Sequence, residues 1–112
     1  MNGVISYIGI GSNLGDSLAN CKEAVARLSS LPETVLERVS SFYKTEPVTD
    51  FPADEAVQEV LKNQSWFTNA VAEIRTRLSP SDLLRELQDI ESVMGRARTF
   101  AGAPRVIDLD LL

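Results

Sequence analysis

Two aspartates, Asp108 and Asp110, stand one residue apart in an apolar segment near the end of this chain. Alternation along an extended strand sends both side chains to one face and Ile107, Leu109 and Leu111 to the other. The Cβ atoms at such positions lie roughly 7 Å apart, so the two carboxylates can reach one hard cation or a pair of cations. The spacing is therefore compatible with a site for divalent cations.

A basic segment precedes these aspartates. Arg96, Arg98 and Arg105 lie in it, and no acidic residue stands between Glu91 and Asp108. Guanidinium groups bind phosphate oxygens through forked hydrogen bonds, and Mg²⁺ prefers carboxylate and phosphate oxygens. The combination indicates a site for a metal-bound polyphosphate, although a solvated strand edge is the simpler explanation of the aspartates alone.

Composition limits the chemistry available to the chain. Its 112 residues include no histidine and one cysteine, Cys21, which excludes imidazole catalysis and a disulfide framework. The net charge of −5 argues against a nucleic-acid-binding surface, and no apolar run approaches the roughly 20 residues of a membrane span. We therefore expect a single cytoplasmic domain, residues 1–112, in which carboxylates and arginines carry any reaction.

The first part of the chain is predicted to form a strand and a helix. Residues 4–10 are β-rich and end in a glycine-rich turn, after which Asp16 is a suitable helix N-cap. The helix should end near residues 29 and 30. Its predicted buried stripe consists of residues at steps of three and four, namely Leu14, Leu18, Cys21, Val25 and Leu28.

The middle of the chain is predicted to form a long strand and then a loop. Residues 34–45 are rich in β-branched and aromatic residues, and alternation puts Val35, Val39 and Tyr43 on one side. Residues 46–64 contain two prolines and several acids, which favours a long loop.

A third strand and a second helix follow. Residues 65–78 are predicted to form a strand, and the alternation of side chains along it puts Phe67 and Asn69 on the same face. The Ser-Pro pair at 79–80 predicts the start of a helix, and Gly95 predicts its end. On this helix Gln88 and Glu91 stand three residues apart, where simple solvation explains both.

The expected order is strand, helix, strand, strand, helix, strand. This order predicts an α+β, ferredoxin-like βαββαβ fold, in which two helices pack on one face of an antiparallel sheet. The other face is left for a ligand. We expect Phe67, Asn69, Asp108 and Asp110 to share that face.

Five short motifs occur in order along the chain. They are YIGIGSNLGD at 7–16, SSFYKTEPV at 40–48, FTNA at 67–70, GRAR at 95–98 and PRVIDLD at 104–110. Each motif is weak alone, whereas five in this order are specific. Together they resemble the 6-hydroxymethyl-7,8-dihydropterin pyrophosphokinase family of folate biosynthesis, and the resemblance runs the length of the chain.

The resemblance implies transfer of pyrophosphate from ATP to the hydroxymethyl group of 6-hydroxymethyl-7,8-dihydropterin, with AMP leaving. It implies that Asp108 and Asp110 hold magnesium, Mg²⁺, as two ions that bridge the ATP phosphates. It also implies that Arg96, Arg98 and Arg105 bind and neutralise the triphosphate.

The same resemblance implies two further groups of binding residues. Gln88 and Glu91 would contact the nucleotide. The pterin would be bound by backbone groups of Thr45 and Val48, by the Asn69 amide and by the Phe67 ring.

A non-catalytic module that binds a small anion or a partner is the alternative, since the ferredoxin-like plan hosts many functions. Chains of the family continue beyond the strand of Asp108 and Asp110, so this sequence is expected to lack their C-terminal segment and to turn over slowly. That strand is also expected at a sheet edge, where an apolar edge invites self-association.

Overall fold

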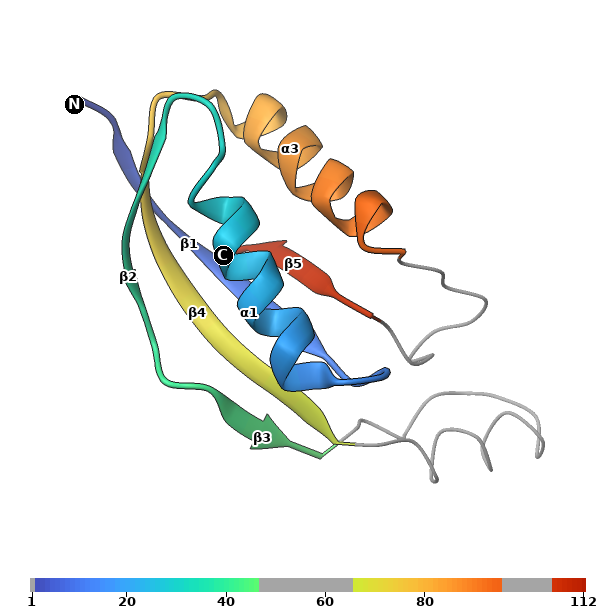
Figure 1. Ribbon diagram of the computed structural model, residues 1–112. Coiled ribbons are helices and arrows are strands. Elements are labelled where there is room, and N and C mark those ends of the chain that lie inside the picture. Colours follow the sequence, from blue (N-terminus) through green and yellow to red (C-terminus); the bar gives the residue numbers. More distant parts are fainter. Residues whose placement is uncertain (1, 47–65, 96–105) are drawn as a thin grey trace, which may run out of the picture.

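The computed structural model of the protein describes residues 2–46, 66–95 and 106–112. These residues form one antiparallel sheet with two helices on one of its faces (Figure 1). In chain order the elements are β1 Val4–Ser12, α1 Ser17–Leu28, β2 Thr34–Val39, β3 Tyr43–Thr45, β4 Phe67–Thr76, α3 Pro80–Val93 and β5 Asp108–Leu111. The predicted α+β, ferredoxin-like arrangement is confirmed, except that its second strand is divided into β2 and β3.

The strand order of the sheet is β2-β4-β1-β5, and β3 pairs with β4 beyond the end of β2. Every neighbouring pair is antiparallel. β1 is central and pairs with β4 on one side and β5 on the other. β5, which carries the aspartates, therefore lies at an edge of the described sheet, as predicted.

Local capping groups set the ends of both helices. The Asp16 carboxylate accepts a hydrogen bond from the Ala19 backbone N–H at 3.1 Å, and α1 ends at Leu28. The Ser79 hydroxyl accepts from the Asp82 N–H at 3.2 Å at the start of α3. Gly95, with a φ of 88°, follows the end of α3 in a conformation that suits glycine. These caps confirm the predicted starts and ends.

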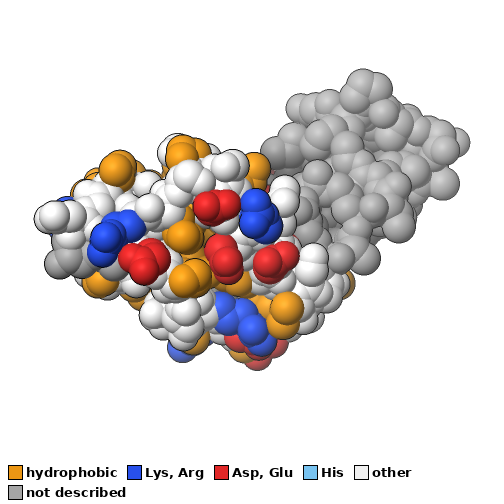
Figure 2. Space-filling view, turned by 90° about the horizontal axis from the view of Figure 1, so that it is seen from above, with side chains coloured by type: hydrophobic (Ala, Val, Ile, Leu, Met, Phe, Trp, Pro, Cys, Tyr) orange, Lys and Arg blue, Asp and Glu red, His pale blue; other side chains and the backbone are white. Residues whose placement is uncertain are grey.

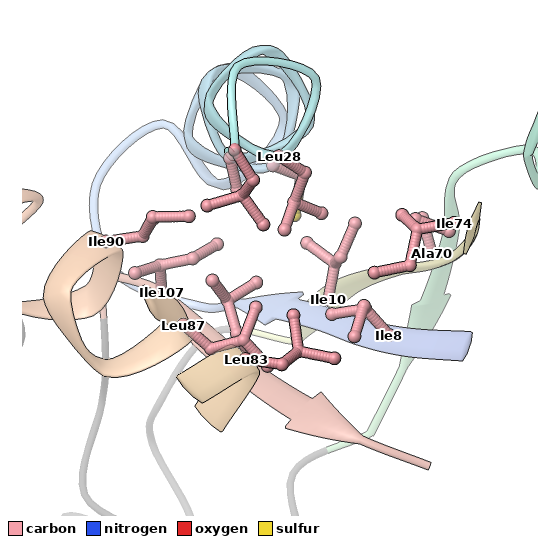
Figure 3. Close-up of a cluster of buried hydrophobic side chains, with 14 residues drawn as sticks. Ile8, Ile10, Leu28, Ala70, Ile74, Leu83, Leu87, Ile90 and Ile107 are labelled. Atoms are coloured by element: carbon pink, nitrogen blue, oxygen red, sulfur yellow. The ribbon is translucent and has the colours of Figure 1, made fainter. Parts of the chain in front are cut away.

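Buried hydrophobic side chains from both helices and the sheet form a single core (Figure 3). β4 contributes every second residue, and its burial alternates along its whole length. α1 contributes Cys21, Ala24 and Leu28, whereas Leu14 and Leu18 of the predicted stripe are 45% and 42% exposed. Burial raises the pKa of the Cys21 thiol to about 11 and keeps it protonated at neutral pH.

A shift in register changes which residues of β2 face the core. The pairing between β2 and β4 is irregular between Leu36 and Arg38, and beyond this point Val39 lies opposite Ala72. Val39 therefore packs against the core, whereas Val35 is exposed. The prediction that both share one side with Tyr43 is wrong, because a bulge reverses the alternation.

Charged side chains of both signs are interspersed on the face of the molecule seen in Figure 2, with hydrophobic side chains between them. The described residues also form exposed ion pairs, such as Arg77 with Glu33 at 3.6 Å and Arg85 with Asp82 at 3.3 Å. Pairs of this kind contribute little to stability. In the described part of the chain, neither helix is both long and apolar enough to cross a membrane.

Candidate active site

The face of the sheet that the helices leave open holds a cavity of about 230 Å³. It is lined by residues of four strands and by the last residue, namely Gly9, Ile10, Gly11, Tyr43, Phe67, Asn69, Ala70, Val71, Asp108, Asp110 and Leu112. Phe67, Asn69, Asp108 and Asp110 therefore share one face, as alternation predicts. The sheet brings together one residue pair suited to a cation and another suited to a flat ring.

The register places the two aspartates in successive rows across the sheet. Asp108 lies opposite Gly11, which in turn lies opposite Asn69 on β4. Asp110 lies opposite Gly9 in the next row. Ile107 and Leu109 are buried on the other face, as predicted, but Leu111 is 37% exposed because it stands at the end of an edge strand.

Two glycines of β1 form the floor of this cavity. A Cβ atom at Gly11 would lie 3.2 Å from Asn69 Oδ1 and 3.7 Å from Phe67 Cδ1. At Gly9 a Cβ would meet Leu112 and Asp110 only at ordinary contact distances of 3.6 Å or more. The floor therefore carries no side chains at these two positions, where a ligand would lie. The absence of a Cβ at Gly11 also leaves space for the Asn69 side chain.

The Asn69 side chain is held by β3. Its Nδ2 donates a hydrogen bond to Thr45 Oγ1 at 2.8 Å, which leaves Oδ1 directed over Gly11. Tyr43, directly opposite Asn69 in the register, adds a second aromatic residue to the cavity. Neither Tyr43 nor the glycine floor was predicted as part of the site, although glycines at alternate positions of a strand signal a close approach on one face.

On the same face, the row beyond Gly9 and Asp110 carries a polar cluster that was not predicted from the sequence. Glu73 accepts hydrogen bonds from the Tyr7 hydroxyl at 3.0 Å and from the Arg38 guanidinium at 2.8 Å. The hydrogen bond from Arg38 lowers the pKa of Glu73, and the hydrogen bond to Glu73 raises the pKa of Tyr7. Glu73 is thus ionised at neutral pH.

The two residues expected to contact a nucleotide lie on α3, outside the cavity. Gln88 is exposed, whereas Glu91 is only 5% exposed and its Oε2 accepts a hydrogen bond from the Leu109 backbone N–H at 2.8 Å. The interpretation of Glu91 as a solvated surface residue is therefore wrong. Its position four residues after Leu87, on the apolar stripe, was the signal that could have revealed its burial.

Four of the predicted site residues lie outside the described residues. They are Val48, Arg96, Arg98 and Arg105. The loop predicted for residues 46–64 lies almost wholly outside them as well.

The carboxylates at the cavity suit a hard divalent cation. Among the described residues, no group of three or more His, Cys, Asp or Glu side chains could hold a metal ion. Mg²⁺ is commonly bound by one or two carboxylates together with water and substrate phosphates. The Asp108 and Asp110 pair therefore fits Mg²⁺ that arrives with a phosphate ligand.

The sequence also matches a known protein family. The family is described as 7,8-dihydro-6-hydroxymethylpterin-pyrophosphokinase, and its model matches residues 7–112. The chain belongs to this pyrophosphokinase family. The predicted resemblance is thereby confirmed, and it supports the interpretation as an enzyme over that of a non-catalytic module.

Individual relatives agree with the family match. The chain is 38% identical over 108 residues to the 2-amino-4-hydroxy-6-hydroxymethyldihydropteridine pyrophosphokinase of Bacillus subtilis, covering 96% of this chain and 58% of that protein. Its identity to the enzyme of the same name from Haemophilus influenzae is 40% over 109 residues, with coverages of 97% and 61%.

A third relative is much longer. The Folic acid synthesis protein fol1 of Schizosaccharomyces pombe is 38% identical over 108 residues, which are 96% of this chain and 13% of that protein. This pyrophosphokinase-family chain thus spans about three fifths of the length of the two bacterial relatives and a small part of the yeast one.

Proposed function

We propose that this chain transfers pyrophosphate from ATP to the hydroxymethyl group of 6-hydroxymethyl-7,8-dihydropterin and releases AMP. One observation carries the proposal: a single cavity is lined by the Asp108 and Asp110 carboxylates and by the Phe67 ring and Asn69 amide. The family match and the names of the relatives support the pterin as one substrate and pyrophosphate as the transferred group. The free Cys21 thiol fits a reducing compartment, and the proposal places the reaction in the cytoplasm.

In this proposal Asp108 and Asp110 hold two Mg²⁺ ions that enter with ATP. When bound, Mg²⁺ neutralises phosphate charge and orients the triphosphate. Arg96, Arg98 and Arg105 add forked donors to the phosphates, and Gln88 of α3 contacts the nucleotide beyond the edge of β5. Mg²⁺ is commonly bound by one or two carboxylates together with substrate phosphates, which supports joint binding of metal and phosphate by the Asp108 and Asp110 pair.

The pterin would lie on the glycine floor. The Phe67 ring packs on its face, Asn69 Oδ1 accepts from its edge, and backbone groups of Thr45 and Val48 complete the edge contacts. The hydroxymethyl oxygen then attacks the β-phosphorus of ATP in line. The bond from this phosphorus to the oxygen shared with the α-phosphate breaks, AMP leaves with that oxygen, and the hydroxyl proton passes to solvent.

Catalysis in such a site comes from positioning and charge neutralisation. Neither contribution needs a histidine base, which this chain does not contain. The carboxylates and the ring-binding residues stand on strands of one sheet, so their separation is set by the pairing register. The sheet is therefore the device that holds the two substrates at a fixed distance.

The metal-binding step is tested by Asp108→Asn, which removes a charged oxygen ligand without changing the side-chain volume. Asp89→Asn is the matched control, since Asp89 is exposed on α3 and loses the same charge. We expect Asp108→Asn to weaken Mg-ATP binding at least about tenfold in titration calorimetry and the control to leave it unchanged. Unchanged Mg-ATP affinity in a folded Asp108→Asn protein would contradict the proposal.

A further inference from the structure

Among the described strands, β5 is short and has a neighbour on one side only, namely β1. The Leu112 N–H donates to the Tyr7 carbonyl of β1 at 2.9 Å. Because backbone N–H groups alternate in direction along a strand, those of Asp108 and Asp110 face β1 as well, and that of Leu109 faces away from it. The peptide group between Asp108 and Leu109 thus directs its N–H toward the outer edge of the described sheet.

Glu91 of α3 occupies this edge position. Its Oε2 accepts the hydrogen bond from the Leu109 N–H at 2.8 Å, and both residues are only 5% exposed. A hydrogen bond from a backbone N–H to a carboxylate is stronger than one between neutral groups. The contact joins the last turn of α3 to the middle of the Asp-x-Asp segment.

A buried carboxylate is an expensive choice at this position. The other buried residues of α3 are Leu83, Leu87 and Ile90, and an apolar side chain would fill the same space without a desolvation cost. An apolar residue would, however, leave the Leu109 N–H without this acceptor. The Glu91 carboxylate therefore supplies a hydrogen-bond acceptor for the Leu109 N–H, which an apolar side chain cannot supply.

We propose that Glu91 is a positioning residue for the aspartate pair. By fixing the peptide between Asp108 and Asp110, it sets the separation and direction of the two carboxylates without touching metal or nucleotide. Metal sites depend on such control, because displacements of about 1 Å in a catalytic group are costly. This inference rests on the proposed function of Asp108 and Asp110, and it replaces a direct contact between Glu91 and the nucleotide.

Two substitutions at Glu91 distinguish the effect of its hydrogen-bond acceptor from the effect of its charge. Glu91→Met keeps a similar volume and removes the acceptor, whereas Glu91→Gln keeps an amide oxygen and removes the charge. Asp89→Asn on the same helix is the exposed control. Two quantities are measured on the 112-residue chain without nucleotide: the hydrogen-exchange rate of the Leu109 amide by NMR, and Mn²⁺ affinity from the electron paramagnetic resonance signal of the free ion.

In Glu91→Met we expect the Leu109 amide to exchange at least about tenfold faster and Mn²⁺ to bind at least about tenfold more weakly. Glu91→Gln should stay within about threefold of the unsubstituted chain in both quantities, and Asp89→Asn should match it. Since no nucleotide is present, these changes cannot arise from a lost nucleotide contact.

Three results would overturn the inference. The first is a folded Glu91→Met protein with normal Mn²⁺ affinity, and the second is one whose Leu109 amide stays protected. The third, which decides the case even if Glu91→Met does not fold, is loss of Mn²⁺ binding in Glu91→Gln while that amide stays protected. If the unsubstituted chain binds Mn²⁺ only with inorganic triphosphate present, the variants are compared in its presence, and no Mn²⁺ binding under either condition would instead contradict the proposed metal site.

Discussion

The Asn69 amide is oriented by two neighbours on adjacent strands. Thr45 Oγ1 accepts from its nitrogen, and the missing side chain of Gly11 leaves space beside its oxygen. This arrangement was only partly predictable from the sequence. Alternation places Asn69 on the open face, but the opposition of Asn69 and Gly11 depends on the register between β1 and β4, which no single segment encodes.

Gly11→Ala should impair pterin binding while leaving Mg-ATP binding nearly intact. The new Cβ would lie 3.2 Å from Asn69 Oδ1 and would displace the amide that reads the ring edge. We expect the loss of pterin affinity to approach that of Asn69→Ala, about 1–3 kcal/mol for an unpaired polar group. Titration calorimetry with 6-hydroxymethyl-7,8-dihydropterin and, separately, with Mg-ATP measures both effects.

Gly9→Ala is the matched control, because it adds the same Cβ to the same strand but meets its neighbours at 3.6 Å or more. Its loss of pterin affinity should be clearly smaller than that of Gly11→Ala. Equal losses in the two variants, or equal losses of pterin and Mg-ATP affinity in Gly11→Ala, would reject the assignment of the ring edge to Asn69.

Elements whose signals are local were predicted well. The start of α3 depends on Ser79 and Pro80 and its end on Gly95, all within one turn of the boundary. β4 alternates without interruption, so the face that carries Phe67 and Asn69 was assigned correctly. Such features need no knowledge of the neighbouring elements.

Elements whose signals depend on neighbours were predicted less well. The bulge that turns Val39 toward the core arises from the pairing of β2 with β4. Leu18 of α1 is exposed because it lies in the first turn, beside a shallow pocket that Phe42 and Thr68 also line. The burial of Glu91 follows from the packing of α3 against the edge of β5.

The edge position of β5 leads to a prediction about assembly. We expect the 112-residue chain to self-associate through β5, because the outward N–H and carbonyl groups of Leu111 can pair with a second copy. The outward N–H of Leu109 already donates a hydrogen bond to Glu91, which limits this pairing to the end of the strand. Sedimentation velocity should show an average mass that rises with protein concentration.

Leu111→Pro is the variant that tests this edge. The Leu111 N–H faces away from β1, so proline removes an outward donor without removing a hydrogen bond to β1. The variant should remain monomeric at concentrations where the original chain associates. A chain that is monomeric at every concentration, or one in which Leu111→Pro changes nothing, would contradict association through β5.

At the scale of the whole molecule, the open face is the feature that function requires. Its cavity of about 230 Å³ is smaller than the roughly 300–1,000 Å³ of typical ligand pockets, so it encloses only part of the two substrates. We therefore expect the 112-residue chain to turn over much more slowly than the Bacillus subtilis relative.

Product analysis tests the central claim, that one face of the sheet binds a pterin beside metal-bound ATP so that pyrophosphate is transferred between them. The 112-residue chain is incubated with ATP, Mg²⁺ and 6-hydroxymethyl-7,8-dihydropterin, and the nucleotides are separated by chromatography. We predict that AMP forms slowly, only when pterin and Mg²⁺ are both present, and not with Asp108→Asn, while Asp89→Asn behaves as the original chain. Formation of ADP in place of AMP, AMP that forms without pterin, or no AMP above the level of Asp108→Asn would contradict the account.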